Sequence, residues 1–257
     1  MTRIFALALA ALGWTATPDP GRAAACEKID FDGAPFTYCV VDLDREELRL
    51  WLRDGEGKPF GSFRNLDAAL AAQGAALGVA MNAGMYHPDR APVGLYIEDG
   101  VEEMRIVTSE GPGNFGLLPN GVFCLAGDRA RVIESRSFAE TPPACDYATQ
   151  SGPMLVIDGA LHPRFLPDSD SRYVRNGIGV RADGREVVMA ISDRAVNFHH
   201  FARLFRDRLD VPDALYFDGN VSRLHAPGLG RIDGGFPMGP IIGTVVPAGD
   251  DAGPAKP

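Results

Sequence analysis

The sequence lacks the short motifs that mark several large classes of enzyme. It contains no Cys-x-x-Cys pair, so it gives no basis for a zinc ribbon or a thioredoxin-type redox site. It also has no Gly-x-Ser-x-Gly elbow, no Walker motif and no dinucleotide fingerprint placed after a predicted strand. These absences disfavour the common serine hydrolases, nucleotide hydrolases and nicotinamide-dependent enzymes.

Positive charge is scarce as well. The 257 residues include 25 Lys and Arg against 34 Asp and Glu, which gives a formal net charge of -9 at pH 7. Such a balance opposes binding to nucleic acid and to anionic lipid. We therefore predict no nucleic-acid partner. Any anionic ligand has to be bound by individual Lys or Arg side chains at its site.

Long apolar runs are absent. The run over residues 4–12 is too short to span a bilayer as a permanent helix. It follows a basic start, and three alanines precede Cys26, which is typical of an export signal. We predict a signal peptide over residues 1–25, no stable membrane insertion and a periplasmic or secreted protein. The alternative is a lipoprotein anchored at Cys26, which the polar spacer over residues 15–22 and Ala23 disfavour.

Cysteine is limited to four residues, and an even number in an oxidising compartment suggests two disulfides. Three pairings are possible. Proximity in the sequence favours Cys26 with Cys39 and Cys124 with Cys145.

The five histidines show no metal-ligand spacing. His199 and His200 are adjacent, so on a helix their side chains point about 100° apart and cannot bind one ion from a single face. We predict neither a metal nor a cofactor.

Short apolar runs separated by turn dipeptides dominate the rest of the chain. They predict strands at residues 36–42, 47–52, 94–98, 121–125, 154–157, 177–181, 186–191 and 214–217, with helices at 66–73 and 198–209. The second helix lies between two predicted strands, as in a crossover unit. We predict an α/β (α+β) fold: a single domain over residues 26–246 with a mixed, largely antiparallel β-sheet and a few helices. A flexible tail follows over residues 247–257.

Polar, glycine-bearing elbows occur at several predicted strand ends. Their residues are Asn82, Gly84, Gln150, Ser151, Gly152, Arg175, Asn176, Asp218, Gly219 and Ser222. A single elbow of this kind is usually a structural turn, whereas several together suggest a site. Asp193 follows another predicted strand and is a candidate second carboxylate beside Asp218. Its alternative role is to pair with Arg194 or to cap the helix near Asn197.

Four motifs in this order resemble the phosphodiester glycosidase family. They are Asn-x-Gly-Met-Tyr from Asn82, Ser-Gly-Pro-Met-Leu from Ser151, Arg-Asn-Gly-Ile-Gly from Arg175 and Leu-Tyr-Phe-Asp-Gly ending at Gly219. The likeness covers residues 26–245 and is greater to exported bacterial members of unassigned function. It implies a single α/β domain that hydrolyses a sugar from a sugar-1-phosphodiester.

The chemistry of this reaction suggests roles for the residues that match the family's motifs and for some of their neighbours. Asp218 is expected at the anomeric carbon, Arg175 on the phosphate, and Arg172 or Arg194 as a helper. Asn82, Gln150 and Ser151 are expected to hold sugar hydroxyls or phosphate oxygens, and Gly84, Gly152, Asn176, Gly219 and Ser222 complete the predicted substrate site. Asn220 and Val221 replace two glycines of the family, which narrows the room beside Asp218.

A non-catalytic alternative remains open. The same fold is compatible with a periplasmic glycan-binding protein or an envelope or exopolysaccharide assembly protein, and the loss of the two glycines favours it. The sequence leaves the sugar, the group on the phosphate and the oligomeric state undecided.

Overall fold

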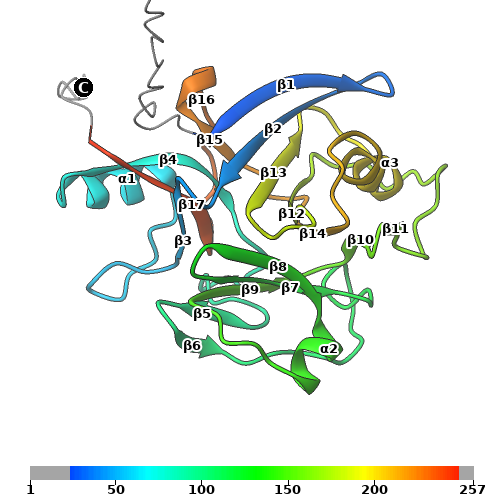
Figure 1. Cartoon of the computed structure of the whole chain (residues 1–257), viewed down its shortest axis with the longest axis horizontal. Coiled ribbons are helices and arrows are strands. Elements are labelled where there is room, and N and C mark those ends of the chain that lie inside the picture. Colours follow the sequence, from blue (N-terminus) through cyan, green and yellow to red (C-terminus); the bar gives the residue numbers. More distant parts are fainter. Residues whose placement is uncertain (1–23, 249–257) are drawn as a thin grey trace, which may run out of the picture.

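The computed structural model describes residues 24–248. Residues 1–23 of the predicted signal peptide and residues 249–257 of the predicted tail lie outside the described part. The described chain folds into three β-sheets and a few short helices (Figure 1). Every ladder within it is antiparallel, and the predicted α+β class is confirmed.

The largest sheet has seven strands. Its order is β1 (Ala25–Phe31), β2 (Ala34–Asp42), β13 (Glu186–Ser192), β12 (Asn176–Val180), β14 (Asp213–Asp218), β10 (Met154–Ile157) and β11 (Ala160–Leu161). Because β12 pairs antiparallel with both β13 and β14, those two strands run parallel to each other. The predicted crossover unit is therefore present, with β12 between its two strands.

Two five-stranded sheets complete the fold. The first has the order β16 (Arg231–Ile232), β15 (Leu224–Ala226), β4 (Ala75–Asn82), β17 (Ile241–Pro247) and β3 (Glu47–Trp51). The second has the order β6 (Val101–Met104), β5 (Tyr96–Glu98), β9 (Tyr147–Ser151), β7 (Gly121–Ala126) and β8 (Arg129–Glu134).

The helices are short and lie outside the sheets (Figure 1). They are α1 (Phe63–Ala71), α2 (Ser135–Glu140) and α3 (Phe198–Arg203), which continues into a π-helical turn, η1 (Leu204–Arg208); a 3-10 turn, η2, covers Pro227–Leu229. Asn197 caps α3, since its side chain accepts a hydrogen bond from the His200 amide. Helix α1 begins three residues earlier than predicted because Ser62 caps it through the Asn65 amide.

The seven-stranded sheet separates two apolar layers. One face carries Val188, Ala214 and Tyr216 and packs against Phe201 and Phe205 of α3 and η1. The other face carries side chains such as Met189, Leu215 and Phe217, and these share one core with buried residues of both five-stranded sheets, among them Leu50 and Phe123. A core shared by all three sheets is typical of a single domain.

The predicted strands are present with small changes in their bounds. Two hairpins form, β10 with β11 and β12 with β13. In the first, Asp158 and Gly159 both have positive φ angles, of 48° and 77°, as a tight hairpin turn requires.

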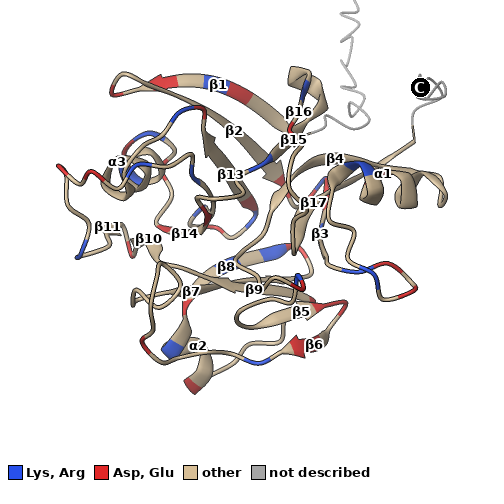
Figure 2. Ribbon diagram, turned by 180° about the vertical axis from the view of Figure 1, so that it is seen from behind, with Lys and Arg blue, Asp and Glu red and all other residues tan. Residues whose placement is uncertain are grey.

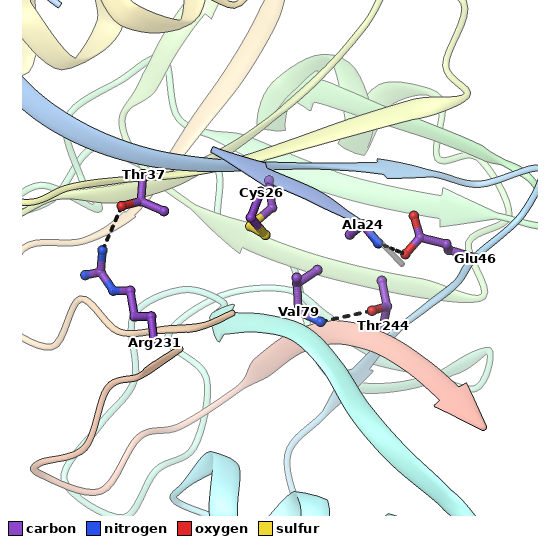
Figure 3. Close-up of a disulfide and its surroundings, with 8 residues drawn as sticks. Ala24, Cys26, Thr37, Glu46, Val79, Arg231 and Thr244 are labelled. Carbon is purple, nitrogen blue, oxygen red and sulfur yellow. Dashed lines mark hydrogen bonds between the residues drawn. A yellow bond between two sulfur atoms is a disulfide. The ribbon is translucent and has the colours of Figure 1, made fainter. Parts of the chain in front are cut away.

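Both predicted disulfides are confirmed. Cys26 is bonded to Cys39 between β1 and β2 (Figure 3), and Cys124 is bonded to Cys145. Because the Cys26 sulfur is engaged in the first bond, it is not free to carry a lipid. Within residues 24–248, no helix has the length and apolar character needed to cross a membrane.

Glu98 connects two of the sheets through a half-buried carboxylate. Its Oε2 accepts hydrogen bonds from the Tyr96 hydroxyl at 2.7 Å and from the Leu52 amide, next to β3, at 3.1 Å. Burial raises the pKa of Glu98 to about 7, and the nearby Glu103 adds to the rise, whereas the two hydrogen bonds oppose it.

This shift predicts a dependence of stability on pH. Between 4.5, the ordinary pKa of Glu, and about 7, folded Glu98 keeps a proton that the unfolded chain releases, so its contribution to stability falls as the pH rises through this window. Glu98→Gln keeps one oxygen that can accept both hydrogen bonds and removes the titration. We expect the variant to be more stable than the parent at about pH 8 and equal to it at about pH 5 in urea denaturation. The same stability difference at both pH values would contradict this assignment.

Candidate active site

Four of the predicted elbows meet at the junction of the three sheets. Asn82 ends β4, Ser151 ends β9, Asn176 begins β12 and Asp218 ends β14. Asn176 and Asp218 are register partners across the β12–β14 ladder. The structure therefore brings together segments that are far apart in the sequence.

Asn82 and Asn176 form a buried amide pair at this junction. The Asn176 Nδ2 donates to the Asn82 carbonyl and to its Oδ1, both at 3.0 Å, and the Asn82 Nδ2 donates to the Asn176 Oδ1 at 3.3 Å. The Arg223 amide donates to the same Asn82 Oδ1 at 2.9 Å. Neither side chain has measurable exposure to solvent, so both predicted substrate-binding amides are engaged inside the protein.

Gln150 and Ser151 are engaged in the same way. The Gln150 amide group donates to Ser135 Oγ and the Val107 carbonyl and accepts from the Leu95 and Val107 amides. The Ser151 hydroxyl donates to the Phe217 carbonyl at 3.2 Å, which ties β9 to β14. These contacts use the polar atoms that the sequence assigned to a ligand.

Two of the predicted glycines are required by the local packing or backbone conformation, and the Ser222 hydroxyl has partners inside the protein. A methyl group on Gly152 would lie 2.4 Å from Asn120 Cβ, and Gly84 has a φ of +121°. The Ser222 hydroxyl lies 2.8 Å from the Val174 carbonyl and 2.9 Å from the Asp218 carbonyl. Ser222 thus contributes to the turn that follows Asp218.

A cavity of about 520 Å³ opens beside the end of β14. Of the predicted site residues, Asp218 and Gly219 line it. The other lining residues are Met85, Tyr86, Val93, Gly113, Asn114, Ser171, Tyr173, Tyr216, Asn220 and Val221. Asn220 and Val221, which replace family glycines, thus border the cavity.

Three tyrosines line this cavity, and none of them is among the site residues that the sequence predicts. Tyr216 was read as part of an apolar strand, although it lies two residues before Asp218, and alternate side chains of a strand share a face. The spacing of two residues from Asp218 is the signal by which Tyr216 could have been recognised as a site residue. Tyr86 and Tyr173 lie in loops and carry no such signal.

Asp218 is partly buried at the cavity wall. Its Oδ1 accepts hydrogen bonds from the Gly219 amide at 2.5 Å and the Asn220 amide at 2.7 Å, which orient the carboxylate. Burial raises the pKa of Asp218 above its ordinary value of 3.8, and the backbone amides of the turn and the charge of Arg223 counteract the rise. It is the one acidic side chain that lines this cavity in residues 24–248.

Arg175 lies directly behind the cavity wall and is fully buried. Its guanidinium carbon is 3.6 Å from the centroid of the Phe198 ring and 5.3 Å from that of Tyr216. Nε donates to the Val196 carbonyl at 2.9 Å and Nη2 to the Ser171 carbonyl at 3.0 Å. Nη1 is also buried and has no hydrogen-bond partner in the described part of the chain.

The structure does not bring Asp193 to this cavity. Its carboxylate forms an ion pair with Arg231 and accepts a hydrogen bond from the Thr37 hydroxyl at 2.9 Å. Figure 3 shows Arg231, which donates a hydrogen bond to the same hydroxyl at 3.0 Å. The alternative partner Arg194 instead donates to the Gly33 carbonyl. Neither Arg194 nor Arg172 lines the cavity.

Of the strands at the junction, β14 carries the charged residues Asp213 and Asp218, whereas β4, β9 and β12 carry none. Strands β4, β7, β9, β10 and β17 carry no charged residue and are tan in Figure 2, whereas β1 carries charges of both signs. No group of three or more His, Cys, Asp or Glu within residues 24–248 is arranged to hold a metal ion. Among the described residues, Asp218 is the charged side chain that lines the cavity.

Gly219 gives a direct test of this geometry. A methyl group there would lie 2.4 Å from the Tyr216 hydroxyl and 3.2 Å from Tyr173 Cβ, so we expect Gly219→Ala to destabilise the fold by roughly 1–3 kcal/mol. Gly228 is the matched control, because a methyl group there meets nothing within 4 Å. Thermal denaturation compares the two variants, and equal melting temperatures would contradict the described packing.

The chain is similar in sequence and in fold to known proteins. The chain is 35% identical over 189 residues to the uncharacterized protein YigE of Escherichia coli K12, covering 74% of this chain and 73% of that protein. The fold resembles the catalytic domain of zebrafish N-acetylglucosamine-1-phosphodiester alpha-N-acetylglucosaminidase, auto-inhibited by its pro-peptide, with a TM-score of 0.58 and 12% identity over 90% of this chain and 84% of that one.

A hypothetical protein from Synechocystis has the same fold, with a TM-score of 0.56 and 13% identity over 87% of this chain; the matched part is 62% of the Synechocystis chain. The family model for phosphodiester glycosidases matches residues 75–226, more than half of the sequence. This segment contains the amide pair, Arg175, Asp218 and the tyrosines of the cavity. The chain belongs to the phosphodiester glycosidase family.

Proposed function

We propose that the protein is an exported hydrolase that releases a sugar from a sugar-1-phosphodiester. Asp218 faces the anomeric carbon, and Arg175 supplies positive charge to the phosphate. The observation that carries the proposal is the placement of one oriented carboxylate in a cavity walled by tyrosines, with an arginine behind them. The name of the zebrafish relative describes an enzyme of N-acetylglucosamine-1-phosphodiesters, which supports this class of substrate.

Asp218 suits the charge that develops in such a reaction. As the bond from the anomeric carbon to the phosphate oxygen breaks, positive charge grows on the sugar ring. A carboxylate held in place by two backbone amides stabilises that charge without having to reorient, and partial burial strengthens the attraction.

The leaving group explains why one carboxylate is enough in the cavity. A phosphate departs as the anion of a strong acid, carrying the bonding electron pair, so it does not need the protonating acid of ordinary glycosidases. Asp193, which the sequence suggested as a second carboxylate, is held by Arg231 and Thr37. In this proposal its role is to join β13 to β2 and β16.

The predicted location agrees with the cysteine chemistry. Two disulfides are typical of proteins that fold in an oxidising compartment, as expected after export. We propose that the protein acts in the periplasm or in the medium. The partner that we propose for it is a phosphodiester-linked sugar or glycan.

Asp218→Asn tests the proposal most directly. The amide keeps an oxygen for the Gly219 and Asn220 hydrogen bonds, so we expect a nearly unchanged melting temperature and a loss of turnover of roughly 10³-fold. The assay is release of free sugar from a panel of sugar-1-phosphodiesters, beginning with alpha-linked N-acetylglucosamine.

Asp213→Asn is the control for this change, because Asp213 begins the same strand and its carboxylate binds the Asp158 amide far from the cavity. An Asp218→Asn variant that keeps turnover would exclude the proposed role. Binding of a glycan without turnover by the parent protein would favour the non-catalytic alternative, for which Asn220 and Val221 at the cavity edge are the structural argument.

The pH dependence of turnover gives a second test. Activity that needs the ionised carboxylate is lost as the pH falls through the pKa of Asp218, and burial places that pKa above 3.8. We therefore expect the acid limb of kcat/KM, measured from about pH 3 to about pH 8, to have its midpoint above the ordinary Asp value. A midpoint at or below that value would contradict the buried environment.

A further inference from the structure

Tyr216 lies on the same face of β14 as Asp218, two residues along the strand. Its ring is fully buried, packs edge-on against Phe198 with centroids 4.7 Å apart, and forms part of the cavity lining. The other two tyrosines of the cavity belong to loops. Tyr216 is thus the phenol that the sheet holds rigidly beside the carboxylate.

The Tyr216 hydroxyl lies against the turn that orients Asp218. A methyl group on Gly219 would be only 2.4 Å from this oxygen, so the absence of a side chain at Gly219 is what makes room for it. Burial raises the pKa of Tyr216, Asp218 adds to the rise, and the charge of Arg175 counteracts it. The hydroxyl therefore remains protonated at neutral pH and acts as a hydrogen-bond donor.

Arg175 lies behind Tyr216 with one donor unused. Its Nε and Nη2 bind backbone carbonyls, whereas Nη1 is buried without a partner in residues 24–248. A buried guanidinium N–H without a partner destabilises the fold, so its retention calls for an explanation. Because the guanidinium lies behind the lining residues, its charge reaches a ligand through the Tyr216 hydroxyl.

We propose that Tyr216 is a further catalytic residue of the proposed reaction, on which this inference rests. When substrate is bound, its hydroxyl donates a hydrogen bond to a non-bridging oxygen of the phosphate and accepts one from Arg175 Nη1, which has no partner in the described structure. Arg175 is then a positioning residue that polarises the hydroxyl.

The proton stays on Tyr216 throughout. As the bond to the anomeric carbon breaks, its electron pair moves to the phosphate, and over the whole hydrolysis a water oxygen forms the new bond to that carbon and releases a proton to solvent. The growing negative charge on the phosphate strengthens the hydrogen bond from Tyr216. Tyr216 therefore acts more strongly on the transition state than on the bound substrate.

Tyr216→Phe tests the proposal, because it keeps the ring and its apolar contacts and removes only the hydroxyl. We expect kcat to fall by about 10²-fold while KM changes by less than about threefold. Tyr38→Phe is the matched control, since the Tyr38 hydroxyl on β2 of the same sheet binds Glu27 at an exposed site. Full kcat in Tyr216→Phe would show that the hydroxyl is not catalytic.

Binding of inorganic phosphate, measured by calorimetry, gives a readout that does not need turnover. We expect Tyr216→Phe to weaken it by about tenfold and Tyr38→Phe to leave it unchanged. Equal affinity in the parent and Tyr216→Phe would overturn the role of Tyr216. Weaker phosphate binding together with a parent protein that cleaves no substrate would reject the proposed hydrolysis and retain Tyr216 as an anion-binding group.

A double-mutant cycle tests the connection to Arg175. If Arg175 acts through the hydroxyl, Arg175→Lys costs less activity in the Tyr216→Phe background than in the parent. Additive losses would mean that the two side chains act independently and would overturn this part of the proposal.

Discussion

The buried amide pair of Asn82 and Asn176 is the contact on which the junction of the three sheets depends. Strands of each sheet begin or end at this junction. Where the chain leaves a strand, its backbone N–H and C=O groups lose their ladder partners and need others. The two amides bind each other, the Asn82 carbonyl and the Arg223 amide, while Ser151 binds the Phe217 carbonyl. Removing one partner of such a network leaves the other unsatisfied, at a typical cost of about 1–3 kcal/mol.

The position of Asp218 follows from this pair. Asn176 is its register partner across β12 and β14, so the amide that fixes β12 against β4 also fixes the end of β14. The turn that begins with Gly219 is closed by Ser222 and continues to Arg223, whose amide returns to Asn82. The carboxylate is thus placed by a closed set of contacts that spans two sheets.

The fold was predicted best where local chemistry decides it. Turn dipeptides such as Asp158-Gly159 and apolar runs such as residues 186–191 identified most interior strands, and short sequence separation gave both disulfides. Strands β1 and β6 escaped prediction because they are largely exposed, so their apolar residues show no regular alternation. Five further strands were not predicted either: β4, β8, β9, β11 and β17. Strands β15 and β16 have three and two residues, too few for any periodicity.

The site was predicted less completely, for a different reason. Motif order located the elbows, but it does not reveal which polar atoms already have partners, and Gln150 uses its amide nitrogen and oxygen inside the protein. Arg175 was expected at the ligand and lies one layer behind it. Tyr216 was hidden because an aromatic residue in an apolar strand reads as core, and it belongs both to the core beneath α3 and to the cavity.

The disulfide between Cys26 and Cys39 has a consequence for the edge of the largest sheet. It joins β1, the outermost strand, to β2, whose sequence from Phe36 to Val41 is rich in aromatic and β-branched residues. Without β1, the N–H and C=O groups along that side of β2 would be open to strands of other molecules, which is how edge strands promote aggregation. The covalent bond keeps β1 paired with β2, so Cys26 helps to prevent the exposure of an aggregation-prone strand at the edge of the largest sheet.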